Sequence, residues 1–353
     1  MDEGFSVGRH AHTLSRRSRR LSAPELVHGP TPLHRPTARA FSVVPALLFD
    51  MDAESSPAGY VTGFLGRSVP LPVPGAGTPV RELAYTHFTV LLDPSRRLAV
   101  VTGVNIDGDH LVDVARGDDW HLDARVPVHE QTGEAVYAGN DLDRGHLVRR
   151  RDPVWGSESA ARQANRDTFA YTNAAPQAAE FNQSKHLWLG LEDHVLNYAR
   201  TNENRISVFT APVLTADDPV YRGVEIPQSF WKIAAWTSLE ENIVILHAAG
   251  FVLDQSAQLS EIELGTAQAL ARIQGSPPPL GPYRTYQVPV AEIIRLTGVA
   301  MPELAEADVL APVLALGAAD GSRQHWIELV DLSAIQVQPS RVTSQERMRD
   351  SLT

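Results

Sequence analysis

Alternating apolar and polar positions predict five β-strands in the middle of the chain. These runs are rich in Val, Ile, Thr and Leu, whose side chains pack well on a pleated surface. Asp93, Pro94 and Ser95 mark a turn between the first two runs. The predicted strands cover residues 86–92, 98–104, 205–213, 229–236 and 242–248.

Two other segments repeat their apolar residues at intervals of three and four, which is the period of an α-helix. They cover residues 183–199 and 260–273. The strands therefore surround a central helix, and no regular alternation of strand and helix is visible. This order predicts an α+β fold with a mainly antiparallel sheet and helices packed on it.

Composition divides the chain into three parts. Residues 1–55 contain the sequence SRRSRR and many prolines, which predicts a basic N-terminal arm without stable structure. Residues 56–300 carry the α+β pattern, and 301–353 form a C-terminal extension with one predicted strand at 326–337. We expect a cytoplasmic location in preference to export, because no apolar stretch follows the arginines of the arm.

Composition also limits the chemistry. The 353 residues are 43% hydrophobic, enough to bury a core, and no run of eighteen apolar residues predicts a membrane span. The sequence has no cysteine, so a metal must be bound by oxygen or imidazole ligands. The net charge of −11 argues against a broad nucleic-acid-binding surface, so any phosphate contact must come from a local group of cations.

Such a group surrounds the sequence Asp143-Arg144-Gly145-His146. A neutral histidine can take a proton from water at neutral pH, and an arginine presents a planar cation to phosphate oxygens. Alone, either side chain is more often structural. Three further arginines follow within a few positions, Arg149, Arg150 and Arg151.

Together with the later segments TNAAPQ (172–177) and FNQ (181–183), this motif resembles the DNA/RNA non-specific endonuclease family, whose core is a ββα-metal finger. The resemblance implies that His146 is the general base, that Arg144 binds phosphate, and that Gly145 leaves room for the substrate backbone. It also implies that Asn182 is the ligand of Mg²⁺, with Mn²⁺ as a substitute. Without the family context, Asn182 would be interpreted as a helix N-cap.

The sequence WLGLED (188–193) resembles a family element whose glutamate orients a water bound to the metal. We therefore predict this role for Glu192. The interval from Asn182 is longer than in the family, and on one uninterrupted helix Asp193 would lie closer to the metal face. We place the insertion in the loop before the helix, and Asp193 remains the alternative.

Arg116 lies before Asp118-Asp119-Trp120 and resembles the family's other catalytic arginine, with Arg125 as the alternative. We also predict that Asn173 and Arg149 bind substrate, although Asn173 suits a buried turn equally well. At the position of a further arginine in some family members this chain has Leu196, so that role passes to Arg200, to His194 or to no residue.

The resemblance implies a Mg²⁺-dependent endonuclease that cuts DNA and RNA with little sequence preference and leaves 5′-phosphate ends. Nothing in the scheme contacts a base or requires a 2′-hydroxyl. Two alternatives stay open: an inactive nuclease-like module that binds nucleic acid or a protein, and a phosphodiesterase of small nucleotides. An inhibitor or a regulatory partner would restrain such an enzyme in its host.

Overall fold

The computed structural model describes residues 59–178, 205–257, 261–311, 326–330 and 335–336. The chain divides between Ala53 and Glu54, and all of these residues belong to the second unit. Within these ranges, no helix combines the length and the apolar character needed to cross a membrane. The domain boundaries expected at residues 56 and 301 stay predictions.

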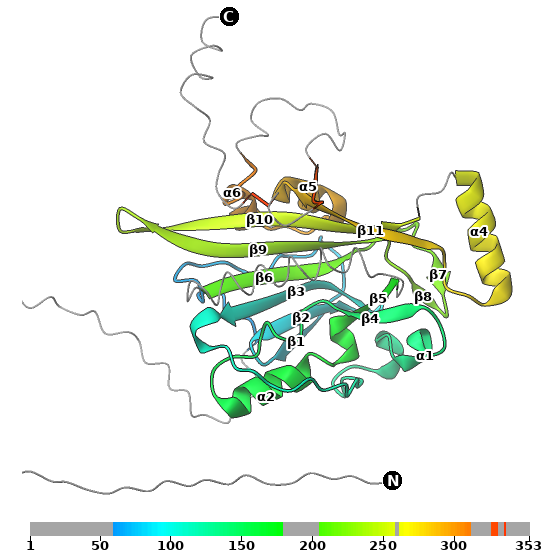
Figure 1. Cartoon of the computed structure of the whole chain (residues 1–353), viewed down its shortest axis with the longest axis horizontal. Helices are drawn as coiled ribbons and strands as arrows, with labels where there is room; N and C mark the ends of the chain where they lie inside the picture. Colours follow the sequence, from blue (N-terminus) through cyan, green and yellow to red (C-terminus); the bar gives the residue numbers. More distant parts are fainter. Residues whose placement is uncertain (1–58, 179–204, 258–260, 312–325, 331–334, 337–353) are drawn as a thin grey trace, which may run out of the picture. The chain divides into compact units, whose positions relative to one another are not determined.

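An eight-stranded sheet organises the described residues, with strand order β1-β2-β3-β6-β9-β10-β11-β12 and antiparallel pairing between neighbours (Figure 1). Its strands are β1 (Arg81–Tyr85), β2 (Phe88–Asp93), β3 (Leu98–Asp107), β6 (Arg205–Val213), β9 (Ser229–Glu240), β10 (Ile243–Ser256), β11 (Leu280–Val288) and β12 (Ile327–Glu328). Two small hairpins accompany it, formed by β4 (Leu142–His146) with β5 (Ala174–Ala178) and by β7 (Val220–Tyr221) with β8 (Val224–Glu225).

The described helices lie between strands in the order of the sequence. They are α1 (Glu134–Tyr137), α2 (Glu158–Asp167), α4 (Glu261–Gln274), α5 (Val290–Thr297) and α6 (Pro302–Glu306). Single 3₁₀ turns occur at Gly108–His110, Val128–Glu130 and Tyr171–Asn173. The predicted fold class, α+β with a mainly antiparallel sheet, is confirmed.

The periodic segments were predicted well where they are described. The strand at 205–213 has the predicted bounds, and the helix at 260–273 differs from α4 by one residue at each end. The strand predicted at 86–92 begins at Phe88, because His87 has a φ of 67° in the tight turn between β1 and β2. Of the strand predicted at 326–337, residues 326–330 and 335–336 are described, and among them Ile327–Glu328 forms a strand. The helix predicted at 183–199 lies outside the described residues.

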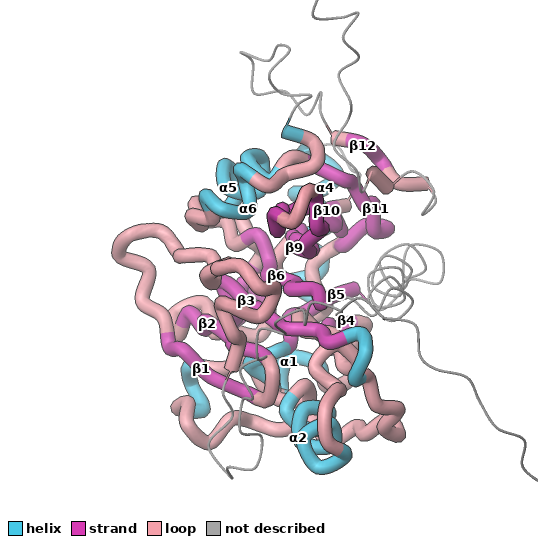
Figure 2. The backbone as a smooth tube through the Cα atoms, turned by 90° about the vertical axis from the view of Figure 1, so that its left-hand side faces the viewer, coloured by secondary structure: helices cyan, strands magenta, loops and turns pink. Residues whose placement is uncertain are grey.

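Apolar side chains cover both faces of the sheet. On one face, Tyr60, Phe64 and Leu65 pack with α5 and α6 against Phe209 and Trp231. The opposite face carries β4, β5 and α1, whose residues join the core formed by Val104, Ile106, Val208, Phe230 and Phe251. Figure 2 shows β4 and β5 on the side of the sheet opposite to α5 and α6.

The described residues after 300 contribute to both cores. Met301 and Leu304 pack beneath α5, while Val309 and Leu310 belong to the core on the side of β4. The predicted C-terminal extension therefore packs on the core in its described part.

Gln255 of β10 attaches the end of β5 to the sheet. Its side chain is 0% exposed. Its Oε1 atom accepts a hydrogen bond from the Ala178 N–H at 3.2 Å, and its Nε2 donates to the Pro227 carbonyl at 2.8 Å. The β4–β5 hairpin is thus fixed to the large sheet at the end from which the chain continues.

Candidate active site

Strand β4 carries the motif and pairs with β5 in antiparallel register, from Leu142 opposite Ala178 to His146 opposite Ala174. Successive side chains of a strand point to opposite faces, so residues two apart share one face. Arg144 and His146 therefore project to the same side. The Trp120 ring lies on that side, 4.7 Å from the His146 ring centre and 5.9 Å from the Arg144 guanidinium carbon.

His146 lies in an aromatic enclosure. The Phe169 ring meets the His146 ring edge to face, with 5.2 Å between the ring centres, and the Trp120 ring packs against it at a tilted angle. Its Nε2 atom is buried and has no hydrogen-bond partner among the described atoms. Burial, with smaller contributions from the Arg116 and Arg150 cations, lowers the pKa of His146 from 6.5 to about 3. The imidazole is therefore neutral at pH 7.

Arg144 is held by an acidic and an aromatic partner. Its Nη2 atom forms an ion pair with Oε2 of Glu134, the first residue of α1. Its guanidinium carbon also lies 5.6 Å from the ring centre of Tyr137. The Nε atom is buried and unpaired within the part of the chain that the structure describes.

The structure places Arg116 and Arg150 near enough to His146 for their charges to act on it. Arg116 is exposed, and its charge lowers the pKa of both His146 and Arg150. Arg150 donates from Nη1 to the Val114 carbonyl at 3.2 Å and to Asn165 Oδ1 at 3.0 Å. Burial lowers the pKa of Arg150 most, and the charges of Arg151, Arg116 and Arg149 lower it further. The expected cationic group is therefore present on an acidic protein.

Arg125, the alternative to Arg116, has another role. Its Nη2 atom lies 2.6 Å from Asp123 Oδ2, and its Nη1 donates to the Ala84 carbonyl at 2.8 Å. The guanidinium also stacks over the Tyr85 ring at 4.6 Å. These contacts use Arg125 to attach a loop to β1, which favours Arg116 as the second arginine of the site.

Asn173 is buried and forms hydrogen bonds with the segment that follows His146. Its side chain is 0% exposed. Oδ1 accepts from the Val148 N–H at 2.8 Å, and Nδ2 donates to the carbonyls of Val148 and Thr168 at 2.9 and 3.0 Å. A buried amide with these three bonds has no surface to offer a substrate. These bonds favour the structural role that the sequence left open for Asn173, in which it positions the segment that follows His146.

Gly145 also differs from our expectation. A Cβ atom at this position would lie 2.1 Å from Cδ of Gln177 and 2.3 Å from its Oε1. The space beside Gly145 is thus filled by the Gln177 side chain of β5, and is not room for a substrate backbone. The glycine permits the hairpin to pack with Gln177 folded across it.

Three predicted positions fall outside the described residues: Asn182, Glu192 and Asp193. The same applies to Leu196, Arg200 and His194. Among the residues that are described, no cluster of three or more His, Asp or Glu side chains could hold a metal. The predicted metal site therefore stays a prediction.

Two residues that lie beside Arg144 were not predicted from the sequence. Glu134 forms the ion pair, and the Tyr171 hydroxyl donates to the same Oε2 atom at 2.6 Å. Neither carried a signal in the sequence, because Glu134 stands in a four-residue helix and Tyr171 in an ordinary aromatic segment. Arg144, Glu134 and Tyr171 line a cavity of about 420 Å³, together with Asp118, Asp119, Trp120, His121 and Leu122.

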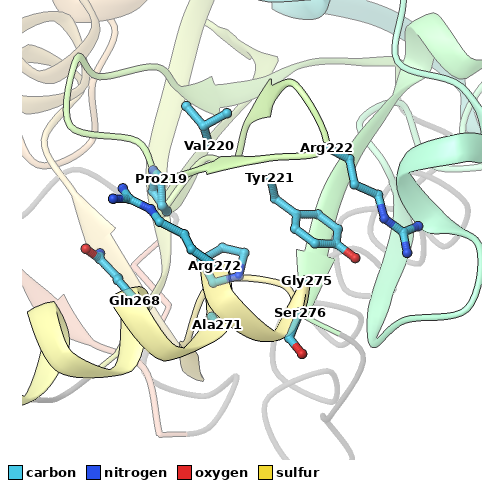
Figure 3. A pocket seen from close by; sticks show the side chains of 10 residues that line it. Pro219, Val220, Tyr221, Arg222, Gln268, Ala271, Arg272, Gly275 and Ser276 are labelled. Carbon is cyan, nitrogen blue, oxygen red and sulfur yellow. The ribbon is translucent and has the colours of Figure 1, made fainter.

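A second cavity, of about 340 Å³, lies between the β7–β8 hairpin and α4 (Figure 3). Arg222 points away from Arg272 in this view. Its Nη1 atom donates to the carbonyls of Ala135 and Ala138 at 2.9 and 2.7 Å. The β7–β8 hairpin thus braces the end of α1, the helix that carries Glu134.

Comparison with known proteins identifies the family. The family model of the DNA/RNA non-specific endonuclease matches residues 68–307. The chain therefore belongs to the DNA/RNA non-specific endonuclease family, as the motif predicted.

Individual relatives show partial similarity. An uncharacterized protein, y4fB, of Sinorhizobium fredii is 40% identical over 263 residues, which cover 68% of this chain and 38% of that protein. The mitochondrial endonuclease G of Bos taurus is 31% identical over 37% of this chain and 42% of its own length, and that of Homo sapiens 30% identical over 41% and 45%. The chain thus spans less than half the length of these relatives. A crystal structure of the EndoG/EndoGI complex has 17% identity and a TM-score of 0.44, covering 62% of this chain and 84% of that one.

The lowered pKa of His146 predicts an acid-dependent loss of stability. The unfolded chain binds the proton near pH 6.5, whereas the folded protein resists it until about pH 3. The free energy of unfolding should therefore fall as the pH drops through this window, by at most about 1.4 kcal/mol per pH unit. Urea unfolding of the wild type and of His146→Gln at several pH values measures the difference, and the exposed His129→Gln serves as the control. Parallel profiles for wild type and His146→Gln would contradict the assignment.

The buried amide of Asn173 predicts a stability effect without a binding effect. Asn173→Ala should lower the free energy of unfolding by about 2 to 4 kcal/mol, because two backbone carbonyls and one N–H lose their partner. At a temperature where the variant is folded, its KM for nucleic acid should equal that of the wild type. A raised KM with normal stability would instead restore the predicted substrate contact.

Proposed function

We propose that this protein is a Mg²⁺-dependent endonuclease that hydrolyses phosphodiester bonds of DNA and RNA with little sequence preference and leaves 5′-phosphate ends. His146 acts as the general base, Arg144 and Arg116 bind the phosphate, and Asn182 holds the metal. Membership of the family supports this proposal. A cytoplasmic location and restraint by an inhibitor or regulatory partner are further proposals.

One observation supports the proposal most directly. His146 Nε2 and Arg144 Nε are both buried, both lack a partner among the described atoms, and belong to residues on the same face of β4. Leaving a buried polar atom unpaired costs about 1 to 3 kcal/mol. Other unpaired buried atoms occur in the described residues, such as Trp231 Nε1 and Thr285 Oγ1, but the two on β4 belong to the motif and share one face. An N–H donor and an imidazole nitrogen on one face suit a phosphate and the water that attacks it.

The surroundings of His146 suit a general base. In the free protein, burial and the cations Arg116 and Arg150 hold the imidazole neutral. A bound phosphate adds negative charge beside the ring, which raises the pKa towards the range where a base is effective. As water attacks phosphorus, Nε2 takes its proton, the new phosphorus–oxygen bond forms, and the bond to the departing oxygen breaks.

The arginines stabilise charge on the phosphate during this step. Negative charge on the phosphate oxygens is greatest in the transition state, so a cation already in place stabilises it more than the ground state. Arg144 is partly buried and has donors left for a phosphate. Arg116 and Arg149 lie near Arg150 in the same cationic group. Contacts of this kind read the backbone and not the bases, in agreement with low sequence preference.

The metal would supply positive charge to the phosphate and to the departing oxygen. Asn182 would provide a neutral oxygen ligand, which suits Mg²⁺ because this ion keeps several waters. Glu192 would act on the hydration shell of the ion. Among the described residues no cluster of three or more His, Asp or Glu side chains could hold the ion, and the proposal therefore takes the oxygen ligand from the segment after β5.

Replacement of the general base gives the main test. His146→Ala should lower kcat by about 10²- to 10⁴-fold on plasmid DNA, single-stranded DNA and RNA in the presence of Mg²⁺. Binding of an uncleaved oligonucleotide in EDTA should stay close to that of the wild type. Near-normal turnover would exclude His146 as the base, and binding by a wild-type protein that never cleaves would identify a binding module.

The two acidic residues after Asn182 give a second test. Glu192→Gln should lower turnover by roughly 10- to 100-fold, the usual contribution of a carboxylate outside the metal's ligands, and Asp193→Asn should have little effect. Mg²⁺ titrations of both variants under one set of conditions measure the ranking. The reverse ranking would show that Asp193 has the role.

A further inference from the structure

The guanidinium of Arg144 is oriented by three groups on two other segments. Glu134 of α1 contacts Nη2, Tyr137 of the same helix lies 5.6 Å from the guanidinium carbon, and Trp120 lies at 5.9 Å. An arginine side chain has many rotamers, and all but one must be excluded before it can bind phosphate in a defined geometry. Two rings limit the plane of the guanidinium, and Glu134 fixes one of its donors by a hydrogen bond.

Glu134 is itself held in place. Its Oε2 atom, which accepts from Arg144, also accepts from the Tyr171 hydroxyl at 2.6 Å. Tyr171 is 5% exposed and stacks on Tyr137 with a ring distance of 6.0 Å. The carboxylate therefore links the buried core to the guanidinium. Arg222 adds support, because it binds the carbonyls at the end of α1.

The ion pair is too exposed to serve mainly in folding. The side chains of Arg144 and Glu134 are 32% and 55% exposed. Ion pairs between exposed side chains contribute little to stability. Glu134 does, however, leave most of the guanidinium open, since arginine has five N–H donors and Glu134 uses one nitrogen. The cavity beside this group gives a phosphate access to the remaining donors.

We propose that Glu134 is a positioning residue, whose Oε2 atom holds Arg144 in the orientation that receives the phosphate. This inference rests on the proposed function. It assigns the effect to the acceptor oxygen and not to the negative charge. The competing interpretation is that the carboxylate competes with the phosphate for Arg144, in which case its removal should strengthen substrate binding.

Two substitutions separate these interpretations. Glu134→Gln keeps an oxygen that can accept from both Arg144 and Tyr171, whereas Glu134→Ala removes the acceptor. We expect Glu134→Ala to lower kcat by roughly 10- to 100-fold, because a small displacement of a binding group has effects of this size. The kcat of Glu134→Gln should stay within about threefold of the wild-type value, a much smaller change than the loss in Glu134→Ala. The assay is cleavage of a fluorescent single-stranded oligonucleotide with Mg²⁺, resolved into kcat and KM.

Tyr171 provides an independent measurement. Tyr171→Phe should lower kcat in the wild-type background and have no further effect in Glu134→Ala, because both changes act through the same oxygen. If Glu134→Ala folds poorly, Tyr171→Phe alone still tests the proposal, because it removes the hydrogen bond that holds the Glu134 carboxylate and keeps Glu134 itself. Glu292→Ala is the matched control: it removes the ion pair with Arg295 on α5, on the opposite side of the sheet, and should leave cleavage unchanged.

Each other result overturns the inference in a distinct way. Equal losses in Glu134→Gln and Glu134→Ala would assign the effect to charge. A lower KM in both would show competition with phosphate, and normal kcat in Glu134→Ala would show no role. In these cases the wild type still cleaves and His146→Ala does not, so the proposed function survives. A wild type that cleaves no substrate would overturn both proposals.

Discussion

The antiparallel register between β4 and β5 determines which groups of the motif meet at the site. Arg144 and His146 face Trp120, while Asp143 and Gly145 face the side of Gln177. A slip by one residue would exchange the two sets and bring the Asp143 carboxylate to the place of the cation and the imidazole. Two features oppose such a slip. Gln177 needs a glycine beside it, and Gln255 fixes the Ala178 N–H to the large sheet.

Local environment, and not overall charge, gives this site its electrostatic character. The chain carries a net charge of −11, yet the arginines around His146 make their surroundings cationic. Aromatic rings strengthen the effect, because Trp120 and Phe169 pack against the imidazole and lower the polarity of its surroundings. The same enclosure explains why the histidine is neutral and why its unpaired nitrogen is buried. An acidic protein can thus carry a local cationic site although its overall charge is negative.

Periodicity in the sequence predicted the long elements, but it could not predict contacts between distant residues. The β6 and α4 segments were found because their apolar positions repeat over many residues. The β1–β2 turn was missed because His87, unlike glycine, gives no sign of a positive φ. Arg116 was connected with His146 only through resemblance to a family. Glu134 and Tyr171 were missed, because their meeting at Arg144 depends on how α1 and a 3₁₀ turn pack, which no local pattern records.

The unpaired atoms of the β4 face also affect how the protein trades stability against activity. Within the described residues, His146 Nε2 and Arg144 Nε are buried without partners, and a ligand that supplied partners would offset this cost. Selection for thermal stability alone would therefore favour apolar side chains at these two positions. Such variants would melt at higher temperature and lose the site. Screens that use melting temperature to improve this protein should hold both positions constant.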